Sequence, residues 1–237
     1  MKADGIDEAL TAPREEFAAG KKAKEESLAA KESTRPFRIA VFASGTGSNF
    51  QAIVDAVRED CLDVRIELLV CDRPQSQVVE RASQAGVPAF TFRPKDYDAK
   101  EQYESEILSL LKAKEIDLVV LAGYMRMITD ILVKPYYGRM INIHPSLLPA
   151  FPGVNAIRQA LEHGVKITGA TVHYVDGGMD SGPIIAQAPV EIRDGDTEET
   201  LSIKIHAAEH KLYPKVIRWI REGRVLLEGR NVRVLQD

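Results

Sequence analysis

Runs of apolar residues alternate with amphipathic segments along the chain between residues 37 and 144. The first run, FRIAVFA at 37–43, has no inside–outside alternation and predicts a strand buried on both faces. Similar runs predict further strands at 64–70, 89–92, 117–123 and 140–143. Apolar residues at helical spacing predict helices at 48–58, 77–86 and 98–114. Buried strands separated by helices predict an α/β fold, a Rossmann-like, mostly parallel twisted sheet with helices on both faces.

The pattern changes after residue 165. KITGATVHYV and PIIAQAPVEI predict longer strands that pair as an antiparallel hairpin around a Gly/Asp loop. Residues 197–222 predict a closing helix, or two helices, interrupted at Pro214. The final VLLEGRNVRVLQD predicts short strands. The C-terminal part is therefore expected to add antiparallel strands to the sheet.

Residues 1–35 differ from the rest of the chain in composition. They are rich in Ala, Glu and Lys and contain few large apolar residues, so they cannot bury much surface. We expect a polar extension at 1–35, helical in patches or disordered, and one domain at 36–237. The 237 residues are 45% hydrophobic, which is enough for one full core.

Charge and cysteine content limit the classes of function. The 31 Lys and Arg residues are mixed with 35 Asp and Glu residues, and the net charge of −4 argues against general nucleic-acid binding. Cys61 and Cys71 lie in or beside apolar runs without a CxxC spacing, which favours core packing in a reducing compartment. No apolar run is long enough to span a membrane, and no secretion signal is visible. The expected location is the cytoplasm.

A glycine-containing turn, ASGTGSN, follows the first predicted strand. Its two glycines let the backbone turn tightly and approach an anion, and the helix that begins next favours negative charge at its N-terminus. The Walker lysine is absent, and Phe50 replaces the third glycine of the dinucleotide fingerprint. This favours a single phosphate, although Asp72 at the end of the second strand keeps a dinucleotide open. An ordinary turn with a Ser/Asn cap is an equal alternative.

Asn142 and His144 end the predicted strand in the sequence MINIHPSLLP. Positions two apart on a strand share a face, so both side chains point the same way at the carboxyl end of the sheet, where ligands bind. An amide and an imidazole aimed at one point can stabilise an oxygen that gains negative charge. The alternative is a polar strand end whose groups bond loop backbone.

The sequence DGGMDSGPIIAQ predicts a flexible loop that presents a carboxylate. Asp180 is the preferred partner of His144, because the strand that returns to the core follows it at once. Its charge would raise the pKa of His144 and orient the imidazole, and it could pass a proton through water. Asp176 competes for this role, and a turn-forming role is the alternative for Asp180.

The sequence HAAEH at 206–210 matches an inverted zinc-protease pattern. Pro214 follows soon afterwards, and the short remainder offers no clear third ligand. We therefore expect a polar helix face and no metal. Glu209 stays a candidate for holding sugar hydroxyls.

Five segments together resemble the phosphoribosylglycinamide formyltransferases, a family of folate-dependent formyltransferases. They are ASGTGSNFQAI, LAGYMRM, INIHPSLLPAFPG, GATVHYVDGGMDSGPII and HAAEHKLYP, and they lie within residues 36–230. The resemblance implies the formyltransferase fold. It also implies direct transfer of the formyl group of 10-formyltetrahydrofolate to the amine of 5′-phosphoribosylglycinamide, through a tetrahedral intermediate, in de novo purine (IMP) biosynthesis.

The resemblance also implies roles for individual residues. The catalytic trio corresponds to Asn142, His144 and Asp180. The phosphate and ribose contacts correspond to Gly47, Ser48, Asn49, His206 and Glu209. The folate-binding residues correspond to Lys100, Met125, Arg126, Met127, Ile128, Asn142 and Asp176. Lys100 stands where relatives can carry Arg, and a lysine lacks the fork that binds a carboxylate twice, which leaves its contact with the folate tail open.

The implied mechanism begins when the neutral amine attacks the formyl carbon. Asn142 and protonated His144 stabilise the negative oxygen, while Asp180 keeps the imidazole charged and accepts the amine proton through water. The proton finally reaches the leaving nitrogen of the folate, and no metal is needed. The implied partners are the two small-molecule substrates, without nucleic acid or membrane. A homodimer is one candidate, because the sequence does not indicate the oligomeric state.

Three alternatives stay open. A formyltetrahydrofolate hydrolase would carry a separate N-terminal regulatory domain and would tend to lack the proline present here as Pro145. A methionyl-tRNA formylating relative would need a basic C-terminal domain, for which the chain ends too early. The third alternative is a nucleotide-binding module without catalysis.

Overall fold

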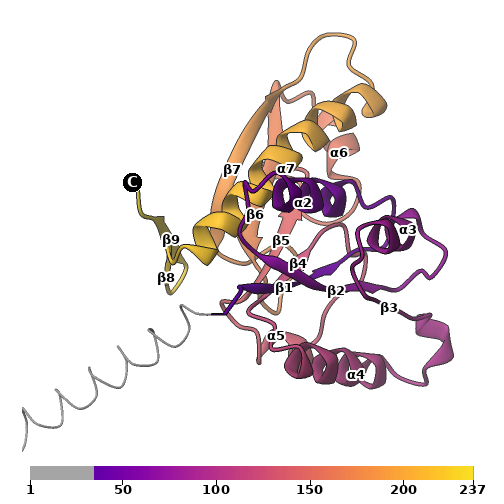
Figure 1. Ribbon diagram of the computed structural model, residues 1–237. Coiled ribbons are helices and arrows are strands. Elements are labelled where there is room, and N and C mark those ends of the chain that lie inside the picture. The colour runs from indigo at the N-terminus through magenta and orange to yellow at the C-terminus, as the bar shows by residue number, and fades with distance from the viewer. Residues whose placement is uncertain (1–34, 237) are drawn as a thin grey trace, which may run out of the picture. The chain divides into compact units, whose positions relative to one another are not determined.

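The computed structural model describes residues 35–236, and seven strands form its main sheet in the order β3-β2-β1-β4-β5-β6-β7 (Figure 1). The parallel strands are β1 (Arg38–Phe42), β2 (Arg65–Cys71), β3 (Ala89–Thr91), β4 (Leu118–Leu121) and β5 (Met140–His144). The antiparallel strands are β6 (Ile167–Tyr174) and β7 (Ile184–Glu191). The predicted mostly parallel sheet with antiparallel C-terminal strands is therefore confirmed.

Helices cover both faces of this sheet (Figure 1). One face carries α2 (Ser48–Arg58), α3 (Gln77–Gln84) and α7 (Glu198–Arg221). The other carries α4 (Lys100–Ala113) and the short α5 (Asp130–Val133). The remaining elements are the 3-10 helix η1 (Pro94–Asp96) and α6 (Ala156–Glu162). The helices predicted at 48–58, 77–86 and 98–114 correspond to α2, α3 and α4.

Strand β1 shows why its sequence has no alternation. Ile39 and Val41 pack into the core beneath α2, α3 and α7, whereas Ala40 and Phe42 pack into the core beneath α4 and α5. All four side chains are fully buried. A strand covered on both faces needs apolar residues at every position, and this pattern identified it in the sequence.

The predicted interruption at Pro214 is wrong, because α7 runs unbroken through it. A proline inside a helix removes one backbone hydrogen bond and costs about 3 kcal/mol. Packing of the neighbouring residue offsets this cost. Tyr213 is completely buried, and its hydroxyl lies 2.8 Å from the carbonyl oxygen of Leu121 and 3.2 Å from that of Ile141. The helix is thus fixed to the last residue of β4 and to the second residue of β5.

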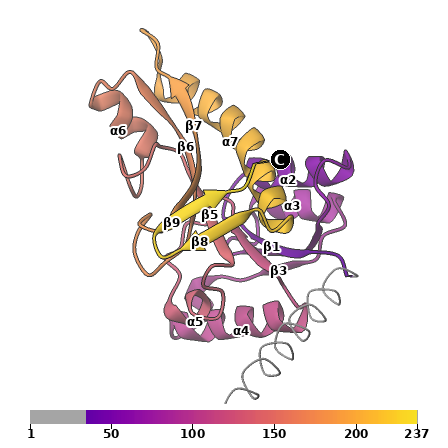
Figure 2. The ribbon, with the colours of Figure 1, turned by 90° about the vertical axis from the view of Figure 1, so that its left-hand side faces the viewer.

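The last residues form the predicted short strands. β8 (Val225–Glu228) and β9 (Asn231–Val234) pair as an antiparallel hairpin that follows α7 (Figure 2). No helix among residues 35–236 is long and apolar enough to cross a membrane. The extension predicted at 1–35 lies, except for its last residue, outside the described residues.

Candidate active site

Asn142 and His144 lie on the same side of β5 at the carboxyl end of the parallel sheet, as their spacing predicts. In the antiparallel ladder with β6, Asn142 pairs with His173 and His144 pairs with Thr171. His144 is only 4% exposed. The two predicted side chains therefore stand beside a strand that contributes polar groups of its own.

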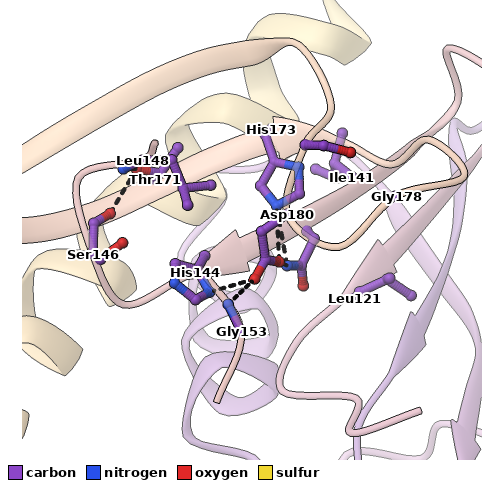
Figure 3. A network of polar contacts seen from close by, with 12 residues as sticks. Leu121, Ile141, His144, Ser146, Leu148, Gly153, Thr171, His173, Gly178 and Asp180 are labelled. Atoms are coloured by element: carbon purple, nitrogen blue, oxygen red, sulfur yellow. Dashed lines mark hydrogen bonds and ion pairs between the residues drawn. The ribbon is translucent and has the colours of Figure 1, made fainter. Parts of the chain in front are cut away.

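Asp180 reaches His144 from the loop between β6 and β7 (Figure 3), and it also contacts Asn142. Its Oδ2 lies 3.2 Å from Nδ1 of His144 and accepts a hydrogen bond of 2.7 Å from the backbone N–H of Gly153. Its Oδ1 accepts a 3.4 Å contact from Nδ2 of Asn142. The three residues of the predicted trio, which come from separate segments, are therefore close together.

Asp176, the competing carboxylate, is used within the loop instead. Its Oδ1 accepts hydrogen bonds from the backbone N–H of Gly178 at 3.0 Å and the hydroxyl of Ser181 at 2.7 Å. Asp180 itself has a φ of +48°, a left-handed conformation uncommon for a residue with a side chain. The loop thus bends through Asp176 and holds Asp180 in a strained conformation that directs its carboxylate at His144.

The imidazole of His144 lies between two hydrogen-bond acceptors. Nδ1 faces Asp180, and Nε2 lies 2.8 Å from the carbonyl oxygen of Phe151. Only a protonated ring can donate to both. Burial nevertheless lowers the pKa of His144 below its ordinary value, against the opposing effects of the Phe151 carbonyl and the Asp180 charge. Asp180 thus acts to raise this pKa, as predicted, but desolvation outweighs the carboxylate.

The carboxyl of Asp180 has a depressed pKa. Burial acts to raise this pKa, but contacts with His173 and Gly153 and the nearby charge of His144 outweigh burial. Asp180 is accordingly ionised in the neutral pH range. It supplies a fixed negative charge beside an imidazole that burial keeps from protonating freely.

His173 is a residue of this cluster that the sequence reasoning missed. Its Nε2 lies 3.2 Å from Nδ2 of Asn142 and 3.6 Å from Oδ1 of Asp180. Its Nδ1 lies 2.8 Å from the carbonyl oxygen of Tyr174, which can only accept, so Nδ1 carries a proton. The sequence feature that could have identified His173 is its position as a lone histidine in an apolar strand that was predicted to form a hairpin.

The glycine turn between β1 and α2 has the geometry of an anion site. Gly47 is the N-cap of α2 with a φ of 74°, and no side chain caps the helix. A Cβ atom at Gly47 would lie 2.5 Å from Cγ2 of Val78, so only glycine fits. The Ser/Asn cap considered as an alternative is absent here, and the first N–H groups of α2 are left without a side-chain acceptor. Ser48 lines a cavity of about 470 Å³ beside this turn.

Asn49 and Glu209 connect this turn to α7. Nδ2 of Asn49 donates to Oε2 of Glu209 at 2.9 Å, and Glu209 is only 3% exposed. Burial raises the pKa of Glu209 above its ordinary value. On the same helix the ring of His206 stacks on that of His210, with centroids 6.3 Å apart. The predicted phosphate and ribose residues therefore gather where α2 meets α7.

Residues 125–128 form an exposed segment after β4. The side chains of Met125 and Met127 are 69% and 48% exposed, while Ile128 packs against the core. Lys100 donates from Nζ to the carbonyl oxygen of Met127 at 3.0 Å. At least one of its hydrogens is thus used to hold this segment.

Hydrogen bonds and an ion pair with residues outside the segment hold residues 125–129 in place. The N–H of Met125 donates to Oγ of Ser44 at 3.0 Å, and Nε of Arg126 pairs with Oδ2 of Asp72 at 2.9 Å. Asp72 is buried, and this ion pair uses Oδ2, one of the two carboxylate oxygens that a dinucleotide ribose could contact. Glu104 accepts hydrogen bonds from the backbone and the hydroxyl of Thr129, at the far end of the segment. The methionines are therefore presented on a rigid base.

Comparison with known proteins identifies similar sequences and structures. Residues 37–217 match the sequence pattern of the formyl transferase family. The chain is 55% identical over 181 residues to the phosphoribosylglycinamide formyltransferase of Bacillus subtilis (strain 168), covering 76% of this chain and 93% of that protein. It resembles the crystal structure of glycinamide ribonucleotide transformylase 1 from Symbiobacterium toebii with a TM-score of 0.83 and 47% identity, covering 85% of this chain and 95% of that one.

A more distant relative has a different name. The crystal structure of a formyltetrahydrofolate deformylase from Pseudomonas syringae is similar with a TM-score of 0.82 and 27% identity, covering 92% of this chain and 75% of that one. The similarity in fold is thus shared by both kinds of protein, whereas sequence identity is much higher to the proteins named for transfer.

Proposed function

This chain belongs to the formyl transferase family, and on that premise we propose that it is a phosphoribosylglycinamide formyltransferase. It transfers a formyl group from 10-formyltetrahydrofolate to the amine of 5′-phosphoribosylglycinamide, a reaction of purine biosynthesis. The observation that carries this proposal is the meeting of Asn142, His144 and Asp180 at the carboxyl end of the sheet.

The acceptor is bound through its phosphate and its ribose. The phosphate lies against the uncapped N-terminus of α2, where Gly47, Ser48 and Asn49 offer backbone N–H groups and the helix dipole favours an anion. Glu209 accepts hydrogen bonds from the ribose hydroxyls, and Asn49 keeps its carboxylate in place. His206 completes this end of the site from the same face of α7 as His210.

The folate-derived donor fits the segment 125–128. An aromatic pterin ring is large and flat, and the exposed thioethers of Met125 and Met127 are suited to contact it. Ser44 and Lys100 hold the backbone of this segment, and Asp72 holds the side chain of Arg126. The donor brings an activated formyl group, and the protein's part is to position it beside the trio.

Asn142 and His144 stabilise the negative charge that develops on the formyl oxygen when the amine attacks. One such donor is typically worth about 10²–10³ in rate. Burial keeps His144 from protonating freely, whereas Asp180 and the Phe151 carbonyl favour the protonated ring. An incoming negative oxygen adds to the second tendency. Because both ring nitrogens already face acceptors, this oxygen must replace the Phe151 carbonyl as the partner of Nε2 before His144 donates to it. Asp180 accepts the amine proton through water and passes it toward the leaving nitrogen.

The decisive assay follows deformylation of 10-formyl-5,8-dideazafolate with and without phosphoribosylglycinamide. Product that forms only with the acceptor supports transfer. Product that forms equally without it identifies a hydrolase. Phosphate-ligand binding without turnover in either condition, unchanged when both Asn142 and His144 are replaced, identifies a non-catalytic nucleotide-binding module.

The remaining parts of the proposal concern location and assembly. Cys71 is buried, as the predicted core packing requires, whereas Cys61 is exposed, so that prediction is wrong for Cys61. Both are free thiols, which agrees with a reducing compartment such as the cytoplasm. The partners are the two small-molecule substrates. A homodimer stays a candidate that light scattering of the purified protein would decide.

A further inference from the structure

Arg81, on α3, is bound to the glycine turn from outside. Its Nε donates to the carbonyl oxygen of Thr46 at 2.9 Å, and its Nη1 donates to Oε1 of Gln51 at 3.2 Å. Thr46 precedes the N-cap of α2, and Gln51 lies in the first turn of that helix. The guanidinium is therefore held at a defined place beside the N-terminus of α2, although it comes from a different helix.

The charge of Arg81 is not neutralised by the protein. Both of its hydrogen-bond partners are uncharged groups, and no carboxylate of residues 35–236 pairs with it. Asp55 and Glu59 line the same cavity, but neither pairs with Arg81, and Oδ1 of Asp55 accepts from Nε2 of Gln51 at 2.8 Å. By contrast, Arg126 is paired with the buried Asp72. A half-buried arginine without a counterion, next to the positive end of a helix dipole, creates a strong local preference for an anion.

The cavity of about 470 Å³ brings this charge together with the candidate phosphate site. Arg81, Ser48 and His210 all line it. A guanidinium has five N–H donors in a planar fork, and Arg81 uses two of them on the turn. The others are available to phosphate oxygens, for which this fork is well suited.

We propose that Arg81 determines the specificity of this site for a phosphorylated acceptor, by binding the substrate phosphate across the glycine turn. This inference rests on the proposed function. In this arrangement the backbone of the turn and of α2 sets the position of the phosphate, and Arg81 supplies the full positive charge that the backbone N–H groups lack.

The test compares two acceptors, phosphoribosylglycinamide and the same riboside without its phosphate. For wild type and for Arg81→Met, kcat/KM is measured with each. Loss of a charge-assisted bond should lower kcat/KM for the phosphorylated acceptor about 10- to 100-fold, and that for the riboside by less than about threefold. Arg81→Lys keeps the charge without the fork, so it should recover part of the preference for phosphate.

Arg58→Met is the matched control. Arg58 also connects α2 to α3, through a 3.4 Å contact from Nη2 to the carbonyl oxygen of Gln84, but at the other end of α2. It should leave the ratio of the two kcat/KM values unchanged. Thermal melting of each variant shows that it is folded before kinetics are compared.

Three outcomes would overturn the inference. The first is a ratio of the two kcat/KM values that is unchanged in Arg81→Met. The second is an equal fall of kcat/KM for both acceptors, which would mean that Arg81 only shapes the turn, and the third is an equal change of the ratio in Arg58→Met. If Arg81→Met does not fold, Arg81→Lys is used in its place. The inference is then contradicted if the ratio of the two kcat/KM values in Arg81→Lys equals that of wild type and added inorganic phosphate has no effect on either protein. Failure of the proposed function is separate, since wild type itself would then transfer no formyl group to the phosphorylated acceptor.

Discussion

His144 shows how one side chain can be balanced between two protonation states. Burial favours the neutral ring, while Asp180 and the Phe151 carbonyl favour the charged one. A group balanced in this way responds strongly to a charge that appears beside it, which is what catalysis by transition-state stabilisation requires. Sequence reasoning found the residues but not the balance, because burial is a property of the packed fold.

Replacement of His144 or Asp180 should reduce the chemical step and spare binding. We expect His144→Ala and Asp180→Asn each to lower kcat at least about a hundredfold, because each removes stabilisation that exists mainly in the transition state. KM for both substrates should stay within a few-fold. Steady-state kinetics at saturating concentrations of both substrates measures this, and near-normal kcat in either variant would show that the trio is wrongly assigned.

The buried carboxylate of Glu209 should lower the free energy of unfolding once it is ionised. Burial raises its folded-state pKa, so its contribution to stability is fully present below the unfolded pKa of about 4.3 and is lost as pH rises through the folded value. Glu209→Gln keeps an acceptor for Asn49 without the charge. At pH 8 this variant should therefore melt at a higher temperature than wild type, by about 2–4 °C for each kcal/mol gained in the free energy of unfolding. At pH 5 the difference in melting temperature should be smaller.

Glu199→Gln, at an exposed position of α7, serves as the control for that substitution. Glu199 lies in the first turn of α7, so its loss should lower the melting temperature slightly, and by the same amount at pH 5 and pH 8. A gain from Glu209→Gln that is the same at pH 5 and pH 8 would show that ionisation of Glu209 is not its cause. The same variant should bind the acceptor more weakly, since an amide is a poorer acceptor for ribose hydroxyls than a carboxylate.

At the scale of single elements, the turn between β1 and α2 depends on one glycine. Gly47 combines a φ of 74° with a Cβ position only 2.5 Å from Val78, so any side chain must push the turn away from α3. Gly47→Val should raise KM for the phosphorylated acceptor at least about tenfold, because misplaced N–H groups lose charge-assisted bonds to the phosphate. Initial-rate kinetics with varied acceptor would measure the change.

Gly86→Val is the control that separates the effect of backbone strain from that of displacing the glycine turn. Gly86 also has a positive φ, of 70°, but nothing lies within 4 Å of its Cβ position. This variant should lose a similar amount of backbone stability and keep its KM. If both variants changed KM alike, general destabilisation would explain the result and the turn would have no special part in phosphate binding.

The elements also show which features the sequence could predict. Local patterns identified β1, α2, α4 and the β6–β7 hairpin, because burial on one or two faces leaves a period in the chain. They could not give the register between strands, which places His173 opposite Asn142. They also misjudged Pro214, because the packing of Tyr213 against β4 and β5 is a tertiary effect that local propensity does not contain.

At the scale of the whole domain, the site is assembled from segments far apart in the chain. Asn142 and His144 come from β5, Gly153 from the following loop and Asp180 from the loop after β6. Even the C-terminal hairpin takes part, since Nη2 of Arg230 donates to the carbonyl oxygen of Ser181 at 2.7 Å. The motif order indicated that these segments belong together, whereas the loop contacts of Phe151, Gly153 and Arg230 leave no recognisable pattern in a single sequence.

Residues 1–35 should be dispensable for the reaction. The match to the formyl transferase family begins at residue 37, and every contact described for the candidate site comes from residues after 43. A chain that starts at Pro36 retains the whole of this domain, and a domain with its own core folds alone. We therefore expect its kcat/KM to stay within about twofold of the full chain, with a similar melting temperature.

Light scattering of both chains should accompany these kinetics, because an assembly held together by residues 1–35 would lose subunits when they are removed. An equal number of subunits and equal kcat/KM would place the active unit within 36–237. A tenfold fall in kcat/KM with the same number of subunits would instead mean that residues 1–35 contribute to the site directly, and the boundary at residue 36 would then be wrong. A fall that appears together with a loss of subunits would assign the effect to assembly, since the contacts around Asn142, His144 and Asp180 all lie within one copy of the domain.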